Sequence, residues 1–189
     1  MIAFIRRSII ILAVLLMVIN PDYSAATHET LQEEEQRIEK YLLSSSDYTN
    51  VKYYADKYSY TYDIPTPILY KLLETESGWG LINPDKYIAS VEGDGGESFG
   101  PAQIQMRTAR RYRKGQTITR KKLLYNIKFN IETACIILSK ERDHFARVED
   151  DESVVWLHAL SSYNMGRYGF NKRMKPNDYA KNIVLAYNS

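Results

Sequence analysis

The sequence predicts a mainly helical domain that carries a small irregular or β-hairpin segment. Along most of the chain after Tyr48, apolar residues recur every three or four positions, which is the period of an amphipathic helix. The exception is the 25-residue stretch from Leu81 to Gln105, which is rich in glycine and proline and has no such period. A chain of 189 residues has room for one domain of ordinary size with its own core.

The first 26 residues differ in composition from the rest of the chain. Arg6 and Arg7 precede an unbroken apolar run of eleven residues, Ile9 to Ile19, and Ser24-Ala25-Ala26 offers the small residues that a signal peptidase reads. This run is shorter than the ~20 residues that cross a bilayer. We therefore expect residues 1–26 to be a signal peptide and the protein to be exported, to the periplasm or the cell exterior. An uncleaved N-terminal anchor is the alternative.

Residues 27–47 are expected to form an N-terminal helix or linker, because a Glu-rich stretch from Leu31 to Leu43 ends in three serines. The domain itself is expected over residues 48–189. Periodicity predicts its helices at Val51–Tyr58, Pro67–Ser77, Thr108–Arg113, Asn126–Phe145, Glu152–Asn164 and Asp178–Tyr187. A long irregular stretch inside a compact domain usually carries function, which directs attention to residues 81–105.

Glu76 is a carboxylate on the apolar face of one of these helices. Leu69, Leu72 and Leu73 lie seven, four and three residues before it and share its face. Burial against such a face raises the pKa of a carboxyl group, and a raised pKa suits a general acid. A structural glutamate paired with an arginine is the alternative. The helix has its own boundary signals, which are Thr66 as N-cap, Pro67 at the first position and Gly78 as a left-handed C-cap.

The charge balance gives no reason to expect nucleic acid as a partner. Without residues 1–26 the chain has 23 basic and 22 acidic residues. A local basic cluster is compatible with a solvated helix face or with contact to an anionic polymer, and it consists of Arg107, Arg110, Arg111, Arg113 and Lys114. Cys135 is the only cysteine and lies on an apolar stripe, so we expect it in the core. The three histidines lack metal-ligand spacing, and we expect no metal and no cofactor.

Three polar motifs follow one another along the chain. They are Glu76-Ser77-Gly78-Trp79-Gly80, Ser98-Phe99-Gly100-Pro101-Ala102-Gln103-Ile104-Gln105 and Ala159-Leu160-Ser161-Ser162-Tyr163-Asn164-Met165-Gly166. One acid together with neutral amides, hydroxyls and aromatic rings is a poor phosphate site and a good carbohydrate site, because sugars offer hydroxyls to amides and flat C–H faces to rings. The 16 tyrosines fit a sugar-binding groove, although they fit an ordinary amphipathic surface nearly as well.

These motifs resemble those of the lytic transglycosylase (SLT) domain family, which is related to goose-type lysozyme. The family pattern is Glu-Ser-Gly, then a Gly-Leu-Met-Gln-Ile-like strand, then Ala-Tyr-Asn-x-Gly. The resemblance covers about residues 48–187, and this chain departs from the pattern with Pro101-Ala102 for Leu-Met and Ser162 for Ala. It implies a lysozyme-like α+β fold in which the irregular or hairpin segment lines the substrate groove.

The resemblance also implies an activity. Glu76 would protonate the glycosidic oxygen between N-acetylmuramic acid (MurNAc) and N-acetylglucosamine (GlcNAc), and would then act as base while the muramic 6-hydroxyl closes a 1,6-anhydro ring. Ser77, Gln103, Tyr163 and Asn164 map onto residues that hold the sugar. The alternatives are that Ser77 and Asn164 cap helix ends and that Tyr163 belongs to the core. The implied partner is the peptidoglycan glycan strand, met by a wall-associated monomer, with an envelope-spanning secretion or conjugation apparatus as a second candidate partner.

Asp94 separates two chemistries. It falls where goose-type lysozyme carries a second acid, and a second carboxylate at ~6.5–9.5 Å from the first permits inverting hydrolysis. An aspartate among glycines is also what a turn selects, and we favour that interpretation. The main expectation is therefore a transglycosylase, with Asp94 as the candidate second acid of a hydrolase. A noncatalytic wall-binding subunit of an envelope-spanning machine is the other alternative.

Overall fold

The structure is a computed structural model, and it describes residues 32–38, 40–42, 44–173 and 175–188. The chain divides into two compact units, Met1–Ser45 and Ser46–Ser189. In the first unit residues 32–38 and 40–42 are helical, as the sequence predicts, and the expected signal peptide lies outside the described residues. None of the helices that the structure describes is both long and apolar enough to cross a membrane.

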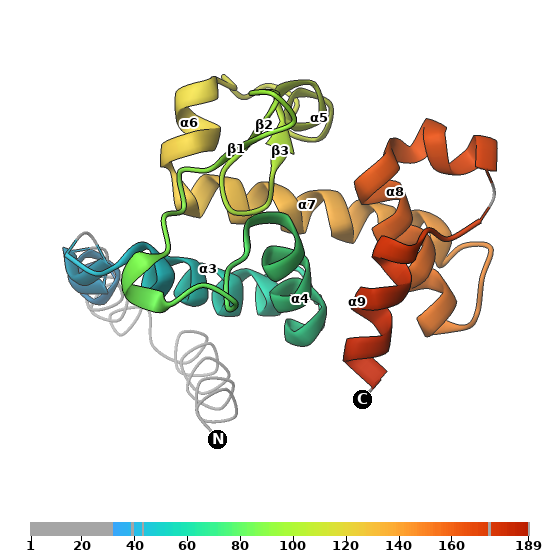
Figure 1. The fold of residues 1–189 in the computed structure, drawn as a ribbon, viewed down its shortest axis with the longest axis horizontal. Helices are drawn as coiled ribbons and strands as arrows, with labels where there is room; N and C mark the ends of the chain where they lie inside the picture. The colour runs from blue at the N-terminus through green and yellow to red at the C-terminus, as the bar shows by residue number, and fades with distance from the viewer. Residues whose placement is uncertain (1–31, 39, 43, 174, 189) are drawn as a thin grey trace, which may run out of the picture. The chain divides into compact units, whose positions relative to one another are not determined.

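The second unit is built around one long helix. α7 (Ile127–Phe145) runs through its middle, and α3 (Asp47–Thr61) and α8 (Glu152–Arg173) pack against it (Figure 1). The predicted apolar stripe of α7 is buried, Cys135 included. Helices account for 68% of the structure and strands for 4%, which confirms the prediction of a mainly α, lysozyme-like fold.

α4 (Thr66–Ser77) carries the predicted acid and begins one residue earlier than expected. Thr66 is the first helical residue and not the N-cap; the cap position is held by Pro65, and no side chain caps this end. The Thr66 hydroxyl instead lies 3.0 Å from the Ser59 hydroxyl of α3. The C-terminal prediction is confirmed, because Gly78 has φ 71° and its N–H donates to the Glu74 carbonyl.

The irregular stretch after α4 folds into a short 3₁₀ turn, η1 (Pro84–Lys86), and a small antiparallel sheet. Its strands are β1 (Glu92–Gly93), β2 (Ser98–Phe99) and β3 (Ile104–Gln105), in the order β1-β2-β3. Phe99 lies opposite Glu92 on one side and Ile104 on the other. The expected hairpin of β1 and β2 is therefore present, and β3, which belongs to the second polar motif (Ser98 to Gln105), extends it to three strands.

Two short helices follow the sheet and pack against α7. They are α5 (Met106–Tyr112) and α6 (Arg120–Tyr125). The sequence predicts the first but not the second, because six residues with only Leu123 and Leu124 as buried apolar positions are too few to display a helical period. Thr119 caps α6 by accepting a hydrogen bond from the Lys122 N–H.

A break in α8 turns the end of the chain back toward α4. Helical structure continues beyond the expected end at Asn164, but Gly166 interrupts it with φ 73° and ψ 147°. This left-handed conformation suits glycine and redirects the segment that leads to α9 (Asp178–Asn188). α9 packs against both α8 and α4 (Figure 1), so it brings its own side chains to the end of the helix that carries Glu76.

Candidate active site

Glu76 is half-buried at the end of α4, behind the fully buried Leu72 and Leu73. Burial raises the pKa of its carboxyl group to about 7; a hydrogen bond from Tyr179 opposes the rise, and the negative charge of Asp94 adds to it. A carboxyl group with this pKa is protonated in a large fraction of molecules near neutral pH. The geometry therefore gives Glu76 the protonation behaviour of a general acid.

Tyr179 is the direct partner of Glu76. Its hydroxyl donates a hydrogen bond of 2.6 Å to Glu76 Oε1 from the first turn of α9. Tyr179 was not among the site residues predicted from the sequence. A signal was present, because Tyr179 lies one residue before Ala180 and four before Ile183, both buried, and a partly buried tyrosine on an apolar stripe needs a hydrogen-bond partner for its hydroxyl.

Asn177 fixes the start of α9 and therefore the position of Tyr179. Its side-chain oxygen accepts from the Ala180 N–H at 3.0 Å, which caps the helix. Its backbone N–H donates to the Ser161 hydroxyl at 3.2 Å, and its side-chain amide donates to Asn164 Oδ1 at 2.9 Å. Asn164, which was predicted as a sugar ligand, is exposed. Because it accepts the hydrogen bond from Asn177, it takes part in joining α8 to α9.

Asp94 occupies the turn between β1 and β2. It has φ 50°, a left-handed conformation that aspartate tolerates, and its Oδ2 accepts a 2.6 Å hydrogen bond from the Ser98 hydroxyl. The side chain is exposed, yet its charge is near enough to raise the pKa of Glu76. The structure thus shows turn geometry at Asp94 and also brings a second carboxylate toward the first.

A buried asparagine holds the second polar motif, Ser98 to Gln105, in place. Asn130 of α7 accepts from the Ala102 N–H at 3.0 Å and donates to the carbonyls of Phe99 at 2.7 Å and Leu123 at 2.9 Å. Gly100, with φ 74°, passes so close that an added Cβ would lie 2.5 Å from Asn130 Nδ2. Only glycine fits this approach without a shift of the backbone.

Gln103 and Tyr163 are both engaged in this loop. The Gln103 amide donates to the carbonyls of Gly100 at 2.9 Å and Val91 at 3.3 Å, so its nitrogen closes the turn. Tyr163 donates from α8 to the Ala102 carbonyl at 2.7 Å. Burial raises the pKa of the Tyr163 hydroxyl well above its ordinary value, and the charge of Glu76 adds to the effect, which brings Tyr163 into the surroundings of the acid.

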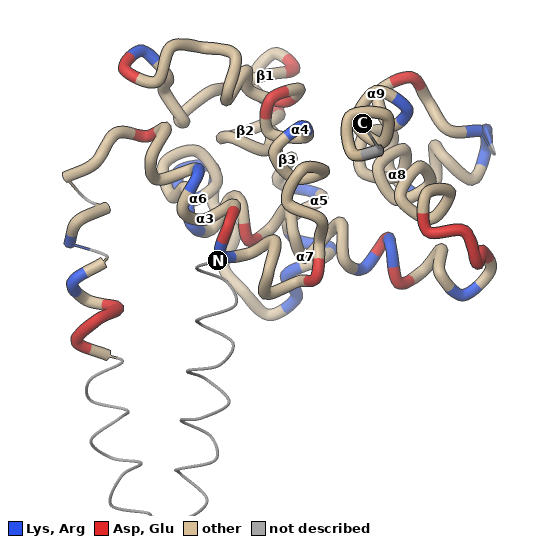
Figure 2. The backbone as a smooth tube through the Cα atoms, turned by 90° about the horizontal axis from the view of Figure 1, so that it is seen from below, with Lys and Arg blue, Asp and Glu red and all other residues tan. Residues whose placement is uncertain are grey.

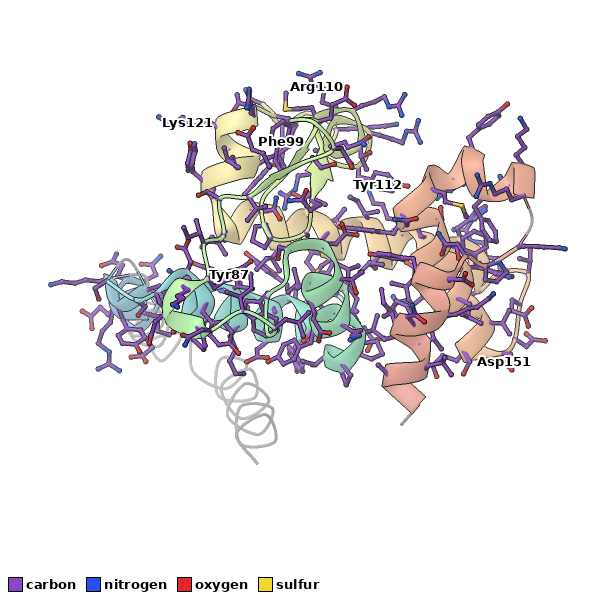
Figure 3. The ribbon with its side chains drawn as sticks, in the orientation of Figure 1. Tyr87, Phe99, Arg110, Tyr112, Lys121 and Asp151 are labelled. Carbon is purple, nitrogen blue, oxygen red and sulfur yellow. The ribbon has the colours of Figure 1, made fainter. Side chains whose placement is uncertain are left out.

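The hydroxyl of Ser77 has its hydrogen-bond partners within the fold. It donates to the Leu73 carbonyl at 3.0 Å and lies 3.0 Å from the hydroxyl of Tyr87. Tyr87, which is labelled in Figure 3, is buried. The neighbouring Trp79 is also buried and stacks on Tyr48, with 5.2 Å between ring centroids. Of the predicted site residues, the structure therefore brings Glu76, Tyr163 and Asp94 together, while the polar groups of Ser77, Gln103 and Asn164 make contacts within the fold.

Residues 53–188 match a family described as the Transglycosylase SLT domain. The chain belongs to this family. No curated protein and no solved structure gives a significant match. The matched range contains all three motifs and also α9, so Tyr179 and Asn177 are part of the SLT domain as Glu76 is.

A second buried carboxylate in this SLT domain has a different environment. Glu141 of α7 is fully buried and accepts from Arg167 at 2.6 and 3.0 Å, from the Ser162 hydroxyl at 2.7 Å and from the Tyr112 hydroxyl. Burial alone would raise its pKa, but these donors outweigh burial and lower it. Glu141 is thus charged, and both of its oxygens accept hydrogen bonds. One of these bonds holds Ser162, the residue directly before Tyr163. Glu141 was not predicted from the sequence, because its donors lie far from it along the chain and leave no local pattern.

Metal ligands do not gather in this part of the SLT domain. Across the residues that the structure describes, no group of three or more histidine, cysteine, aspartate or glutamate side chains is placed to hold a metal ion. The group around Glu76 consists of a carboxyl group with a raised pKa, a tyrosine hydroxyl that orients it and a second carboxylate, and such a group is suited to proton transfer.

Proposed function

We propose that this protein is a peptidoglycan lytic transglycosylase that cleaves the β-1,4 bond between MurNAc and GlcNAc and leaves a 1,6-anhydroMurNAc end. The observation that carries the proposal is Glu76, whose burial raises its pKa to about 7 within a chain of the SLT family. An acid of ordinary pKa would be ionised at neutral pH and would have no proton to donate to the leaving oxygen.

Glu76 serves twice in the proposed reaction. It first gives its proton to the glycosidic oxygen, and the bond between that oxygen and C1 of MurNAc breaks. The muramic 6-hydroxyl oxygen then bonds to C1, and the Glu76 carboxylate takes the proton that the hydroxyl loses. No water enters the product, and the glutamate ends in its starting state. Tyr179 orients the carboxyl group through its hydrogen bond to Oε1.

Mass spectrometry of muropeptides released from purified peptidoglycan tests this function. The wild-type protein is expected to release fragments with anhydro ends, and Glu76→Gln is expected to lose about 10²–10⁴-fold in rate, the usual contribution of general acid–base catalysis. Glu74→Gln is the matched control, because Glu74 lies on the same helix and pairs with Lys71. Reducing-end products, no release at all, or equal losses in both variants would each contradict the proposal.

A goose-type hydrolase is the second candidate, and the proximity of Asp94 favours it. A hydrolase needs a second carboxylate to activate water, and Asp94 is the carboxylate whose charge acts on Glu76. Its turn conformation and its hydrogen bond from Ser98 give it a structural purpose without catalysis, which is why the transglycosylase is preferred. Reducing ends in the wild-type digest would select the hydrolase.

A further inference from the structure

A hollow of about 470 Å³ lies where the end of α3, α5 with its following turn, and α7 meet. None of the residues that line it belongs to the group around Glu76. Its lining combines aromatic and aliphatic groups with cations and neutral polar groups, and consists of Tyr62, Arg111, Tyr112, Arg113, Lys114, Gln116, Ile136, Ser139 and Lys140. The basic residues of α5 and of the turn after it are blue in Figure 2.

The charge of this lining is positive and incompletely neutralised. It contains four basic residues and no carboxylate. Arg113 is neutralised by Glu132, with 2.6 Å between Nη2 and Oε2. Within the part of the chain that the structure describes, Arg111, Lys114 and Lys140 form no ion pair. Three cations thus face a single hollow without a partner anion.

One wall of the hollow is held in place by contacts within the fold. Arg113 is buried and held by Thr133 at 2.7 Å, by Gln116 at 3.1 Å and by the Phe129 ring, whose centroid lies 4.1 Å from its guanidinium carbon. Lys140 donates to the Tyr112 carbonyl at 3.2 Å. This wall is therefore ordered before a ligand binds, and only the exposed side chains, such as those of Arg111 and Lys114, lose rotational freedom on binding.

We propose that this hollow binds an oxyanion, phosphate or carboxylate, carried on a sugar of a wall polymer. Arg111, Lys114 and Lys140 supply the countercharge, and Arg111 can bind both oxygens of such a group. Tyr62, Tyr112 and Ile136 offer apolar surface to the sugar ring, while Gln116 and Ser139 offer hydrogen bonds to its hydroxyls. The inference rests on the proposed function only for the choice of polymer, since binding needs no turnover.

The test is an NMR titration of the ¹⁵N-labelled full chain, kept in neutral detergent, with glucose 6-phosphate, glucuronate and neutral glucose. Either charged sugar is expected to shift the amide signals of residues 111–116 and 139–140 saturably, and glucose is not. Arg111→Glu with Lys114→Glu is expected to raise the apparent Kd about tenfold or more. The matched control is Arg110→Glu with Lys121→Glu, which changes the net charge equally at exposed positions outside the hollow (Figure 3).

The relative affinities for the two charged sugars identify the anionic group that the hollow binds. A tighter Kd for glucose 6-phosphate assigns the site to a phosphate-bearing polymer, and a tighter Kd for glucuronate assigns it to a carboxylate-bearing one. Absence of saturable shifts at these amides, or equal weakening by the control pair, would overturn the proposal. So would an oligonucleotide that shifts the same amides at lower concentration than both sugars, because the hollow would then serve nucleic acid. Wall cleavage by Glu76 is measured separately and is unaffected by any of these results.

Discussion

Tyr179 donates a 2.6 Å hydrogen bond to Glu76 across a sequence separation of 103 residues. The bond favours the charged form of the carboxyl group, whereas burial favours the neutral form more strongly. The resulting pKa of about 7 is therefore a balance between an apolar wall supplied by α4 and a hydroxyl supplied by α9. Changes to either contributor should move the pH range in which the acid is protonated.

The first prediction concerns the pH profile of kcat/KM on solubilised glycan strands. Activity needs protonated Glu76, so kcat/KM should fall as pH rises through about 7. Tyr179→Phe removes a contribution that lowers the pKa of Glu76, so the alkaline fall should move to higher pH while the maximal rate drops because the carboxyl group is less well oriented. Tyr187→Phe, on the same helix, is the control and should leave the profile unchanged. An unmoved fall in Tyr179→Phe would mean that Glu76 is not the titrating acid.

The second prediction concerns Asp94→Asn. Removal of a negative charge near Glu76 makes its ionisation easier, so the pKa of Glu76 falls and the alkaline limb of kcat/KM should move to lower pH. Asparagine tolerates the left-handed turn and can accept the hydrogen bond from Ser98, so most of the activity at pH 6 should remain and products should keep anhydro ends. Glu97→Gln in the same turn is the control. Complete loss of activity in a folded Asp94→Asn protein would favour the hydrolase.

The third prediction concerns the stability of Glu76→Gln. The folded carboxyl group holds its proton more tightly than the unfolded one, so ionisation of Glu76 destabilises the native state as pH rises. The variant has no such group. Its free energy of unfolding relative to wild type should therefore increase between pH 4.5 and pH 8, by up to about 3 kcal/mol. Urea unfolding at both pH values measures the difference; a difference that does not change with pH would contradict the raised pKa.

The fourth prediction concerns Glu141→Gln. The substitution leaves the Arg167 guanidinium without its anion, and loss of one partner of a buried pair costs about 3–5 kcal/mol. Because the Arg167 side chain is 36% exposed, we expect a smaller loss, about 2 kcal/mol at pH 7. Since the pKa of Glu141 is lowered in the fold, its contribution should disappear as pH falls below the ordinary carboxyl range.

Asp143→Asn is the control for Glu141, because it breaks an exposed ion pair with Arg142 on the same helix. Exposed pairs contribute ~0–1 kcal/mol, so this variant should unfold at nearly the wild-type urea concentration. Similar stability losses in the two variants would show that the Glu141 network stabilises the fold no more than a surface pair does.

The features of the fold and of the site that could be predicted from the sequence are those that depend on a local pattern of residues. Glu76 was recognisable because three leucines precede it at helical spacing, and Gly78 because a helix end needs a left-handed residue. The motifs that contain Gln103 and Tyr163 also indicated the region of the site, because amides and hydroxyls beside one acid suit a carbohydrate ligand. Their hydrogen-bond partners were not predictable, because Gly100, Val91 and Ala102 contribute backbone carbonyls, which every residue carries.

The parts that sequence analysis missed depend on contacts between distant segments. Tyr179, Asn177 and Glu141 each owe their role to a partner on another helix, and no periodic pattern encodes that partner. The N-cap of α4 was misplaced for a related reason. The Thr66 hydroxyl meets Ser59 of α3, and this tertiary contact replaces the local capping bond that the sequence favoured.

The docking of α9 has a consequence for the order of folding. A contact between residues 103 positions apart forms only after a long loop has closed, whereas the turns of α4 form from neighbours. Until α9 docks, Glu76 lacks the hydrogen bond from Tyr179, so the contribution that α9 makes to its pKa and to its orientation is absent. The acid site is therefore complete only when this distant contact has closed, and the ionisation behaviour of Glu76 reports whether α9 has reached its native position.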